Sequence, residues 1–244
     1  MIKRILRFLF KNGLLLLLGL FLGLVIFTPW ELVWNNALDK MNKQASMVAL
    51  QWKEMESASF RGFTLRGVDV RSPQGRYRAD AVDIRLGLFT PLKAVIATGP
   101  ETLNLAMSWG KSLSLDGGVE IGMLLNKPNT AGQVTLLGNI DWETFEAPPV
   151  SGRLALGSQM LAWEGKTNLA GLIVESSLEG SILTLETLAI EKPLPVRMQG
   201  EIDVNWARIT QSKSEFEGGV QIGDKEQRFK KKGSLQQLLN QAGL

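Results

Sequence analysis

Two hydrophobic patterns divide the chain. From Gly13 to Trp30 runs GLLLLLGLFLGLVIFTPW, a stretch without a charged residue. As a helix with a rise of about 1.5 Å per residue it would span roughly 27 Å, close to the thickness of a bilayer's hydrocarbon core. Apolar residues then recur at helical intervals over Glu31–Gln44, and from Val48 onward they alternate with polar residues. This order predicts a membrane helix, a short amphipathic helix and a β-rich body.

The charges around the apolar run predict its orientation. Four basic residues precede it, namely Lys3, Arg4, Arg7 and Lys11. The next basic residue is Lys40, and Trp30 is suited to the far membrane interface. By the positive-inside rule the N-terminus is cytoplasmic. We therefore predict a cytoplasmic flank and transmembrane anchor over residues 1–30 and a periplasmic domain over residues 31–244, in a bacterial inner membrane.

Two other readings of this segment fit less well. A cleaved signal peptide has a shorter apolar core followed by a small-x-small cleavage site, whereas IFTPWELVW follows the run here. A buried helix of a soluble protein rarely combines five consecutive leucines, Leu14–Leu18, with a basic flank. An uncleaved anchor explains both features.

The body alternates with period two along many short segments. They include 48–52, 63–70, 77–86, 103–109, 113–121, 134–136, 154–156, 183–185, 196–198 and 202–204. Turn-forming residues separate them about every ten residues, which is typical of an antiparallel meander. The fold class we predict is mainly β, a curved antiparallel sheet with two or three short helices. Each strand has one apolar side, so that face must meet a second sheet, a helix or a ligand.

Glycines and two short segments refine this picture. Gly67 lies where the alternation shifts phase and could accommodate a bulge. Five further glycines are read as turns that start strands: Gly118, Gly138, Gly152, Gly200 and Gly219. Leu88–Ala97 has apolar residues at helical spacing and predicts a helix. Ser234–Gln241 begins with a capping box, Ser234 with Gln237, and predicts another.

Composition excludes several chemistries. The chain has no His and no Cys, which rules out catalytic triads, imidazole bases, thiolate nucleophiles, disulfides and His or Cys metal sites. We assign no catalytic, cofactor-binding or metal-binding residue and expect a non-enzymatic protein. The basic residues at the two ends leave 19 basic against 24 acidic residues between Asn12 and Gln227, a net charge of −5. This body lacks the basic stripe of a nucleic-acid binder.

The remaining candidates have simpler explanations. Asp80 and Asp83 are three apart, which places them on opposite faces of a strand, and the pairs Glu54/Glu56 and Asp141/Glu143 read as solvated charge. Five tryptophans are expected to fill the core: Trp52, Trp109, Trp142, Trp163 and Trp206. The run Lys230–Lys232 reads as a solvated edge strand, with anionic lipid headgroups as the alternative contact.

The stretch SFRGFTLRGVDVRSPQGRYRADAVDIRLGLFTPLKAVIATG resembles the N-terminal unit shared by AsmA-like proteins and the type II secretion system protein N family. The matching positions are Gly62, Leu65, Gly67, Val68, Val70, Gly75, Ala79, Asp80, Ile84, Leu86, Leu92 and Gly99. The unit comprises a glycine-centred hairpin, a strand and a short helix ending in glycine. The chain length is similar to protein N, and AsmA-like chains are generally longer. The resemblance implies no catalytic residues.

Two functions follow from topology and resemblance. The first is a non-enzymatic, membrane-anchored component of a type II secretion system that docks other machine subunits or exoproteins. The second is an AsmA-like lipid-binding or lipid-transfer module in which a curved sheet holds an apolar groove open for acyl chains, with phospholipid as the candidate ligand. Alternation alone does not separate them, because a core and a lipid site have the same period-two pattern.

Overall fold

The structure is a computed structural model. It describes residues 19–20, 22–23, 25–44, 48–73, 75–127, 129–144, 146–163, 165, 167–223, 225–234 and 236–237, with only the main chain at 163, 167 and 210. Lys3, Arg4, Arg7, Lys11 and the first part of the predicted anchor lie outside the described residues. Within the described part of the chain, the helices are too short or too polar to span a membrane.

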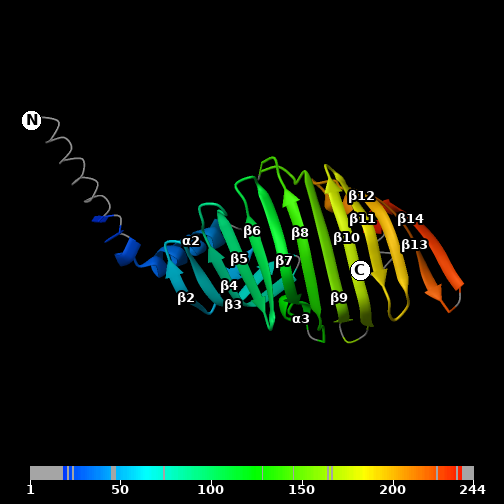
Figure 1. Ribbon diagram of the computed structural model, residues 1–244, viewed down its shortest axis with the longest axis horizontal. Coiled ribbons are helices and arrows are strands. Elements are labelled where there is room, and N and C mark those ends of the chain that lie inside the picture. The colour runs from blue at the N-terminus through cyan, green and yellow to red at the C-terminus, as the bar shows by residue number, and fades with distance from the viewer. Residues whose placement is uncertain are drawn as a thin grey trace, which may run out of the picture.

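The body is one antiparallel sheet of 14 strands, which curves along its length (Figure 1). From β3 to β14 every strand pairs with its neighbours in sequence, and β1 and β2 both pair with β3. The predicted meander is confirmed. The strands are β1 (Ala49–Gln51), β2 (Glu54–Ser59), β3 (Gly62–Ser72), β4 (Gly75–Arg85), β5 (Leu92–Thr98), β6 (Glu101–Met107), β7 (Ser112–Glu120), β8 (Gln133–Asp141), β9 (Ser151–Trp163), β10 (Thr167–Glu179), β11 (Ile182–Ile190), β12 (Val196–Asp203), β13 (Lys213–Ile222) and β14 (Lys225–Ser234).

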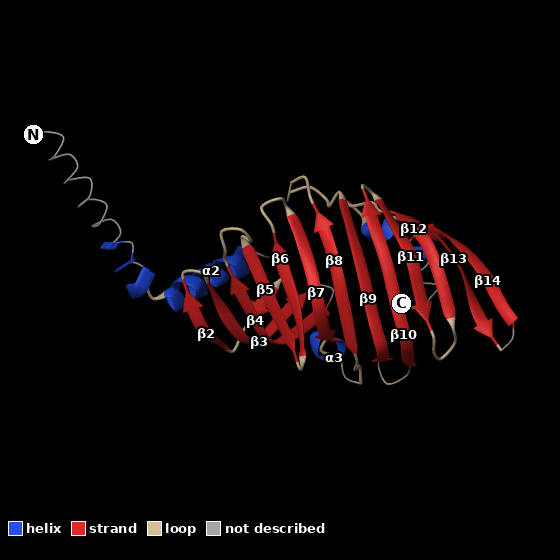
Figure 2. Ribbon diagram, viewed as in Figure 1, coloured by secondary structure: helices blue, strands red, loops and turns tan. Residues whose placement is uncertain are grey.

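The helical elements are few. They are α2 (Trp30–Gln44), α3 (Ile121–Leu124) and the 3-10 turn η1 (Ile209–Gln211). Figure 2 shows α2 at the N-terminal end of the sheet and α3 at its lower edge. The helix predicted over 31–44 is confirmed by α2.

Helix α2 closes the first strands into a core. Its buried Leu38 packs with Phe63 and Leu65 of β3, and the rings of Trp34 and Phe63 lie 4.9 Å apart. Asn42 fastens the C-terminal end of the helix to β1, because its amide donates to the Leu50 carbonyl oxygen at 2.7 Å and accepts from the Leu50 amide at 2.9 Å. A half-apolar helix is thus held over a half-apolar sheet.

The helix predicted over Leu88–Ala97 is wrong, because Leu92–Thr98 is strand β5. Apolar residues on both sides of this short segment satisfy either period. Pairing decides the outcome: β5 lies between β4 and β6, where Ile96 is opposite both Val82 and Leu103. The segment that the resemblance places in a short helix is therefore a strand in this chain.

The shift in alternation predicted at Gly67 is confirmed, but it does not arise from a bulge. Gly67 adopts φ +59°, and Leu65 and Val68 on either side of it are both buried in one core. The register between β3 and β4 does not change across this point. Strand β4 must therefore shift its own alternation at the same level, between Ala79 and Val82, which join the same core.

The glycines read as strand starts are not turns. Gly118, Gly138, Gly200 and Gly219 lie inside strands, whereas Gly152 is the second residue of β9, and all five are absent from the glycines with positive φ. At Gly138 and Gly200 a Cβ atom would run into main-chain atoms of the neighbouring strand. These positions need glycine because strands approach closely there.

The capping box at the C-terminal end of β14 is present. The Gln237 amide donates to the Ser234 hydroxyl at 3.2 Å, and the Ser234 amide donates to the Gln237 side-chain oxygen at 3.1 Å. This reciprocal pair satisfies two amides at a helix start. Residues 236–237 are helical, and the rest of the predicted helix lies outside the described residues.

Candidate functional site

The register places one set of side chains on a single apolar face of the sheet. We call this set the apolar face; the alternate side chains form the polar face. The apolar face consists of Phe63, Leu65, Val68, Val70, Val82, Ile84, Ala94, Ile96, Leu103, Leu105, Leu113, Leu115, Val119, Val134, Leu136, Ile140, Leu154, Leu156, Leu172, Val174, Leu178, Leu183, Leu185, Leu188, Ile190, Val196, Met198, Ile202, Phe216, Val220 and Phe229.

Two cores cover the N-terminal part of the apolar face. The first combines α2 with β1 to β4 around Leu38 and Leu65. The second lies at α3, where Ile121 and Leu124 pack against a buried group from β6 to β8 that includes Val119 and Val134. The members of this second core extend to β9. Both cores therefore stop before the last five strands.

From β10 to β14 the apolar face continues, but most of its side chains are only half-buried. The half-buried members are Leu172, Val174, Leu183, Leu185, Leu188, Ile190, Val196, Met198, Ile202, Phe216, Val220 and Phe229. Leu154, on the adjoining β9, is 37% exposed. We call Leu154 and these twelve side chains the open apolar strip.

A contiguous group of partly exposed apolar side chains such as this strip is unusual on a protein surface. An isolated leucine at the surface needs no explanation, but a contiguous apolar patch marks a surface that meets another molecule. The main chain of the strip is already paired between neighbouring strands, so the strip presents side-chain hydrocarbon to whatever covers it. Any molecule or segment that covers this surface must itself be apolar.

The polar face carries ion pairs that hold adjacent strands in register. Asp69 accepts hydrogen bonds from Arg76 and Arg78 of β4, which lower the pKa of Asp69 to about 2. Glu215 pairs with Lys230 and Lys232 of β14, each at 2.8 Å, and these bonds lower the pKa of Glu215 to about 2. The basic partners in both groups are exposed, although the Asp69 side chain itself is only 13% exposed, so the pairs fix geometry more than they add stability.

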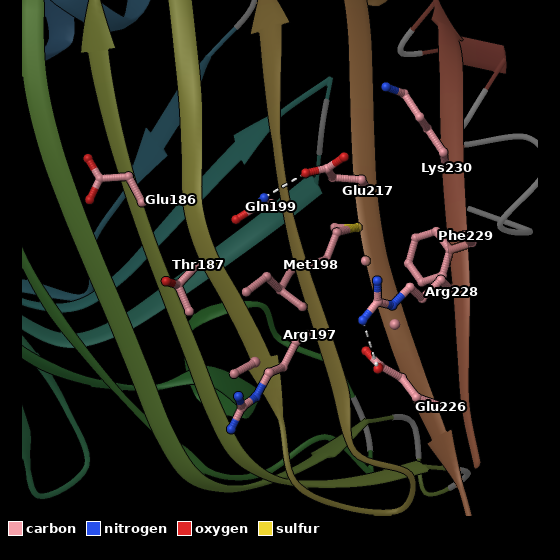
Figure 3. A pocket seen from close by; sticks show the side chains of 14 residues that line it. Glu186, Thr187, Arg197, Met198, Gln199, Glu217, Glu226, Arg228, Phe229 and Lys230 are labelled. Atoms are coloured by element: carbon pink, nitrogen blue, oxygen red, sulfur yellow. Dashed lines mark hydrogen bonds and ion pairs between the residues drawn. The ribbon is translucent and has the colours of Figure 1, made fainter.

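A shallow depression of about 820 Å³ lies over β11 to β14 (Figure 3). Gln199 donates to Glu217 at 2.7 Å, and Arg228 pairs with Glu226 at 3.4 Å. Lys230, also on its rim, is bonded to Glu215. Five of its polar-face side chains, Gln199, Glu217, Glu226, Arg228 and Lys230, are bonded to other polar side chains, so the geometry favours a solvated outer surface over a binding site.

The carboxylates considered as acid–base pairs have separate partners. Asp80 accepts from the Gly99 amide at 2.8 Å, whereas Asp83 accepts from the Thr64 hydroxyl at 2.9 Å and pairs with Arg85. The structure does not bring Asp80 and Asp83 to one site. The absence of catalysis stays a prediction.

In each of the other two pairs, one carboxylate is bonded to a different group. Glu56 is bonded to Arg66 at 2.8 Å, which lowers the pKa of Glu56. Asp141 accepts from the hydroxyl of Ser151 at 3.2 Å, on the polar face. Among the described residues, no cluster of three or more acidic side chains is arranged to hold a metal ion.

The tryptophans divide between core and surface. Trp52 packs in the core under α2, and Trp142 is half-buried. Trp109 is 70% exposed and Trp206 37% exposed, so the prediction of a core role is wrong for these two. Both follow segments of alternating apolar and polar residues, as the core residues do, so the sequence does not distinguish them. They are exposed because they lie in the connections between strands, at the edge of the sheet. The Trp163 side chain is not described.

Of the predicted anchor flank, the described residue is Trp30, the first residue of α2. Its indole nitrogen donates to the Val25 carbonyl oxygen at 2.8 Å, and its ring centroid lies 6.2 Å from that of Phe60. Trp30 therefore joins the segment before α2 to the turn between β2 and β3.

The Lys230–Lys232 run lies on the edge strand β14, as predicted. Lys230 and Lys232 point to the polar face toward Glu215, and the register places Lys231 on the opposite face, across from Phe216. A lysine on the inner side of an edge strand discourages pairing with another sheet.

Comparisons of the chain with protein-family models, curated proteins and solved structures gave no match.

Proposed function

We propose that this protein binds extended lipid acyl chains along the open apolar strip, as a membrane-anchored lipid-binding or lipid-transfer module. The observation that carries the proposal is the half-buried state of that strip at β10–β14, beyond the cores formed at α2 and α3.

The dimensions and energetics of the strip suit an acyl chain. Strands about 4.8 Å apart place β10 to β14 across roughly 19 Å, the length scale of an extended phospholipid tail. Burying hydrocarbon contributes about 0.8 kcal/mol per methylene, so a dozen methylenes would gain about 10 kcal/mol before the entropy cost of binding. Ordinary membrane lipids can therefore occupy such a surface without a charged pocket.

The predicted topology gives the strip a source of ligand. An anchor over Gly13–Trp30 with a cytoplasmic N-terminus places the sheet in the periplasm, beside the outer leaflet of the inner membrane. The sheet then offers hydrocarbon surface in an aqueous compartment. Phospholipid is the apolar ligand most available there.

The test compares two leucines in adjacent strands. Leu154 lies in the open apolar strip, and Leu137 lies on the polar face at 62% exposure. The full chain is expressed with a photo-crosslinking amino acid at 154 or at 137, irradiated in membranes and analysed by mass spectrometry for covalent lipid. We expect lipid adducts several-fold more abundant at 154. Equal labelling at the two positions, or none at 154, would overturn the proposal.

A matched substitution pair adds a binding measurement. Leu154→Gln puts a polar group into the strip, and Leu137→Gln makes the same change on the other face. Native mass spectrometry of the full chain released gently from detergent should show lipid occupancy reduced several-fold by Leu154→Gln only. Unchanged occupancy in both variants would contradict a site on the apolar face.

A second candidate is a non-enzymatic component of a type II secretion system that docks machine subunits or exoproteins. Its support is the glycine hairpin and the strand that the resemblance implies, which correspond to β3 and β4; the third element of that unit, the short helix, is strand β5 in this chain. Crosslinking the full chain in its host and identifying the attached proteins tests it. Capture of secretion-system subunits, with secretion lost on deletion and no lipid adducts at 154, would favour this candidate.

A further inference from the structure

Three neighbouring connections at one edge of the sheet expose large apolar side chains. In an antiparallel meander alternate connections lie at the same edge, and the β2–β3, β4–β5 and β6–β7 connections share the upper edge in Figure 1, opposite α3. Phe60 is 45% exposed, Leu88 82%, Phe89 93% and Trp109 70%. We call these four side chains, with the basic residues beside them, the aromatic edge.

The four side chains form one surface. The indole nitrogen of Trp109 donates to the Leu88 carbonyl oxygen at 2.6 Å, which joins the β6–β7 turn to the β4–β5 connection. The Leu86 amide donates to the Arg61 carbonyl oxygen at 2.6 Å, which joins that connection to the β2–β3 turn. These two bonds tie the three connections together, and the exposed fractions show that their apolar side chains face outward.

Cations surround this surface. A hollow of about 420 Å³ is lined by Leu88 and Phe89 together with Arg61, Arg85 and Lys93, and its lining includes no acidic residue. Arg85 is paired with Asp83 of its own strand. Arg61 and Lys93 are therefore the cations most available to an outside anion. The body as a whole is acidic, so this basic group is a local feature.

The aromatic edge is continuous with the end of the N-terminal segment. Trp30 contacts Phe60, and Arg61 lies over the Phe60 ring with its guanidinium carbon 5.9 Å from the centroid. Ile26 and Phe27, just before Trp30, are 68% and 84% exposed. The edge thus begins where the predicted anchor ends. It stops at the β8–β9 connection, which carries Glu143 and Glu146.

We propose that the aromatic edge docks onto the surface of the bilayer, with Leu88, Phe89 and Trp109 in the interfacial layer and Arg61 and Lys93 on anionic phospholipid headgroups. Aromatic side chains favour that layer, and basic side chains favour anionic lipid. Docking would fix the sheet beside the membrane and orient the open apolar strip relative to it. This inference rests on the membrane anchorage in the proposed function.

The absence of cysteine from the chain allows a direct test. Phe89→Cys creates a single labelling site at one end of β5, and Pro100→Cys creates one in the exposed turn at the other end. Each full-length variant receives a nitroxide and is incorporated into nanodiscs containing phosphatidylglycerol. Collisions with oxygen and with a water-soluble nickel complex report the depth of the label by electron paramagnetic resonance.

We expect the label at 89 to be shielded from nickel several-fold more than the label at 100, and to gain oxygen accessibility. Replacing phosphatidylglycerol by phosphatidylcholine, or adding Arg61→Gln with Lys93→Gln, should reduce this difference. A label at 89 as accessible to nickel as the label at 100 would overturn the docking. A label at 89 that is shielded from nickel but gains no oxygen accessibility, as under a protein partner, would overturn it as well.

A second measurement leaves Phe89 in place. Lipids brominated in the acyl chain quench the fluorescence of tryptophans that enter the bilayer. Such lipids should therefore quench a larger share of the fluorescence in the wild type than in Trp109→Phe. Equal quenching of the two proteins would contradict insertion of Trp109. The two proposals fail differently. A chain that does not enter nanodiscs overturns both the anchorage and the docking, whereas an incorporated chain with an aqueous residue 89 and lipid adducts at 154 overturns the docking alone.

Discussion

Gly218 of β13 lies directly opposite Phe229 of β14, and a Cβ atom at residue 218 would be 2.9 Å from the Phe229 ring. It would also meet the carbonyl oxygen of Arg197 on the other side. The open apolar strip thus accommodates a large ring because its neighbour has no side chain. A large side chain on one strand is thus matched by a small residue on the next, as close packing requires.

Gly218→Ala should therefore destabilise the C-terminal strands. The added methyl has no space between main-chain and ring atoms, and overpacking of this kind costs about 1–3 kcal/mol. The matched control is Gly219→Ala, since a Cβ there meets only the exposed side chain of Glu226. Thermal unfolding of the full chain in detergent should show a lower Tm for Gly218→Ala than for Gly219→Ala. Equal Tm values would mean that β13 and β14 can move apart enough to accommodate the added methyl group, and would contradict the prediction.

Acid should weaken the pairing of β13 with β14. The pKa of Glu215 is lowered to about 2 by Lys230 and Lys232, whereas an unfolded glutamate titrates near its ordinary value of 4.5. A carboxylate whose pKa is lower in the folded state contributes stability above the unfolded value, and that contribution is lost as pH falls toward 2.

The variant Glu215→Gln should lower the Tm slightly at pH 7 and reduce its fall between about pH 4.5 and 2. Glu175→Gln, also on the polar face, serves as the control for removing one acidic charge. The effect is small because the groups are exposed. Parallel Tm curves for wild type and Glu215→Gln across this range would show that the pairs with Lys230 and Lys232 do not form in solution.

The sequence predicted the sheet because period-two alternation is a local property. Each strand shows it without reference to its partners, and short connections leave the meander as the simplest order. It failed at Leu92–Thr98 because Lys93 is the segment's one charged residue, and a short, mostly apolar run fits helix and strand alike. There the partners β4 and β6 decide the structure.

The open apolar strip could be predicted only in part. The sequence shows that Leu185 and Leu188 belong to apolar sides of strands, but not that the cores at α2 and α3 end before them. That depends on where helices pack in three dimensions. The aromatic edge was missed for a similar reason: Leu88 and Phe89 were placed in a helix, and Trp109 in the core, and only the meander brings these connections together.

Helix α2 should be held mainly by Leu38. This side chain is 6% exposed and packs against Phe63 and Leu65, whereas Leu32 on the same helix is 62% exposed. Leu38→Ala removes buried hydrocarbon and leaves a cavity, at a cost of about 2–5 kcal/mol, and Leu32→Ala should change stability by well under 1 kcal/mol.

Limited proteolysis of the full chain at increasing temperature separates these variants. Cleavage within residues 30–60 should begin at a lower temperature in Leu38→Ala than in wild type or Leu32→Ala. If Leu32→Ala were the more damaging variant, the exposed side of α2 would be covered by the membrane or a partner.

A buried hydroxyl supports the end of the second core. Thr98 has no exposed surface, and its hydroxyl accepts a hydrogen bond at 2.8 Å from the amide of Glu120, the last residue of β7. Thr98→Val keeps the shape of the side chain but leaves that amide without its acceptor, at a cost of about 1–3 kcal/mol. Thr98→Ser retains the hydroxyl and loses one methyl. Hydrogen exchange should therefore show the Glu120 amide exchanging faster in Thr98→Val than in Thr98→Ser. Faster exchange in the serine variant would show that packing of the Thr98 methyl, and not this hydrogen bond, protects the junction between β7 and α3.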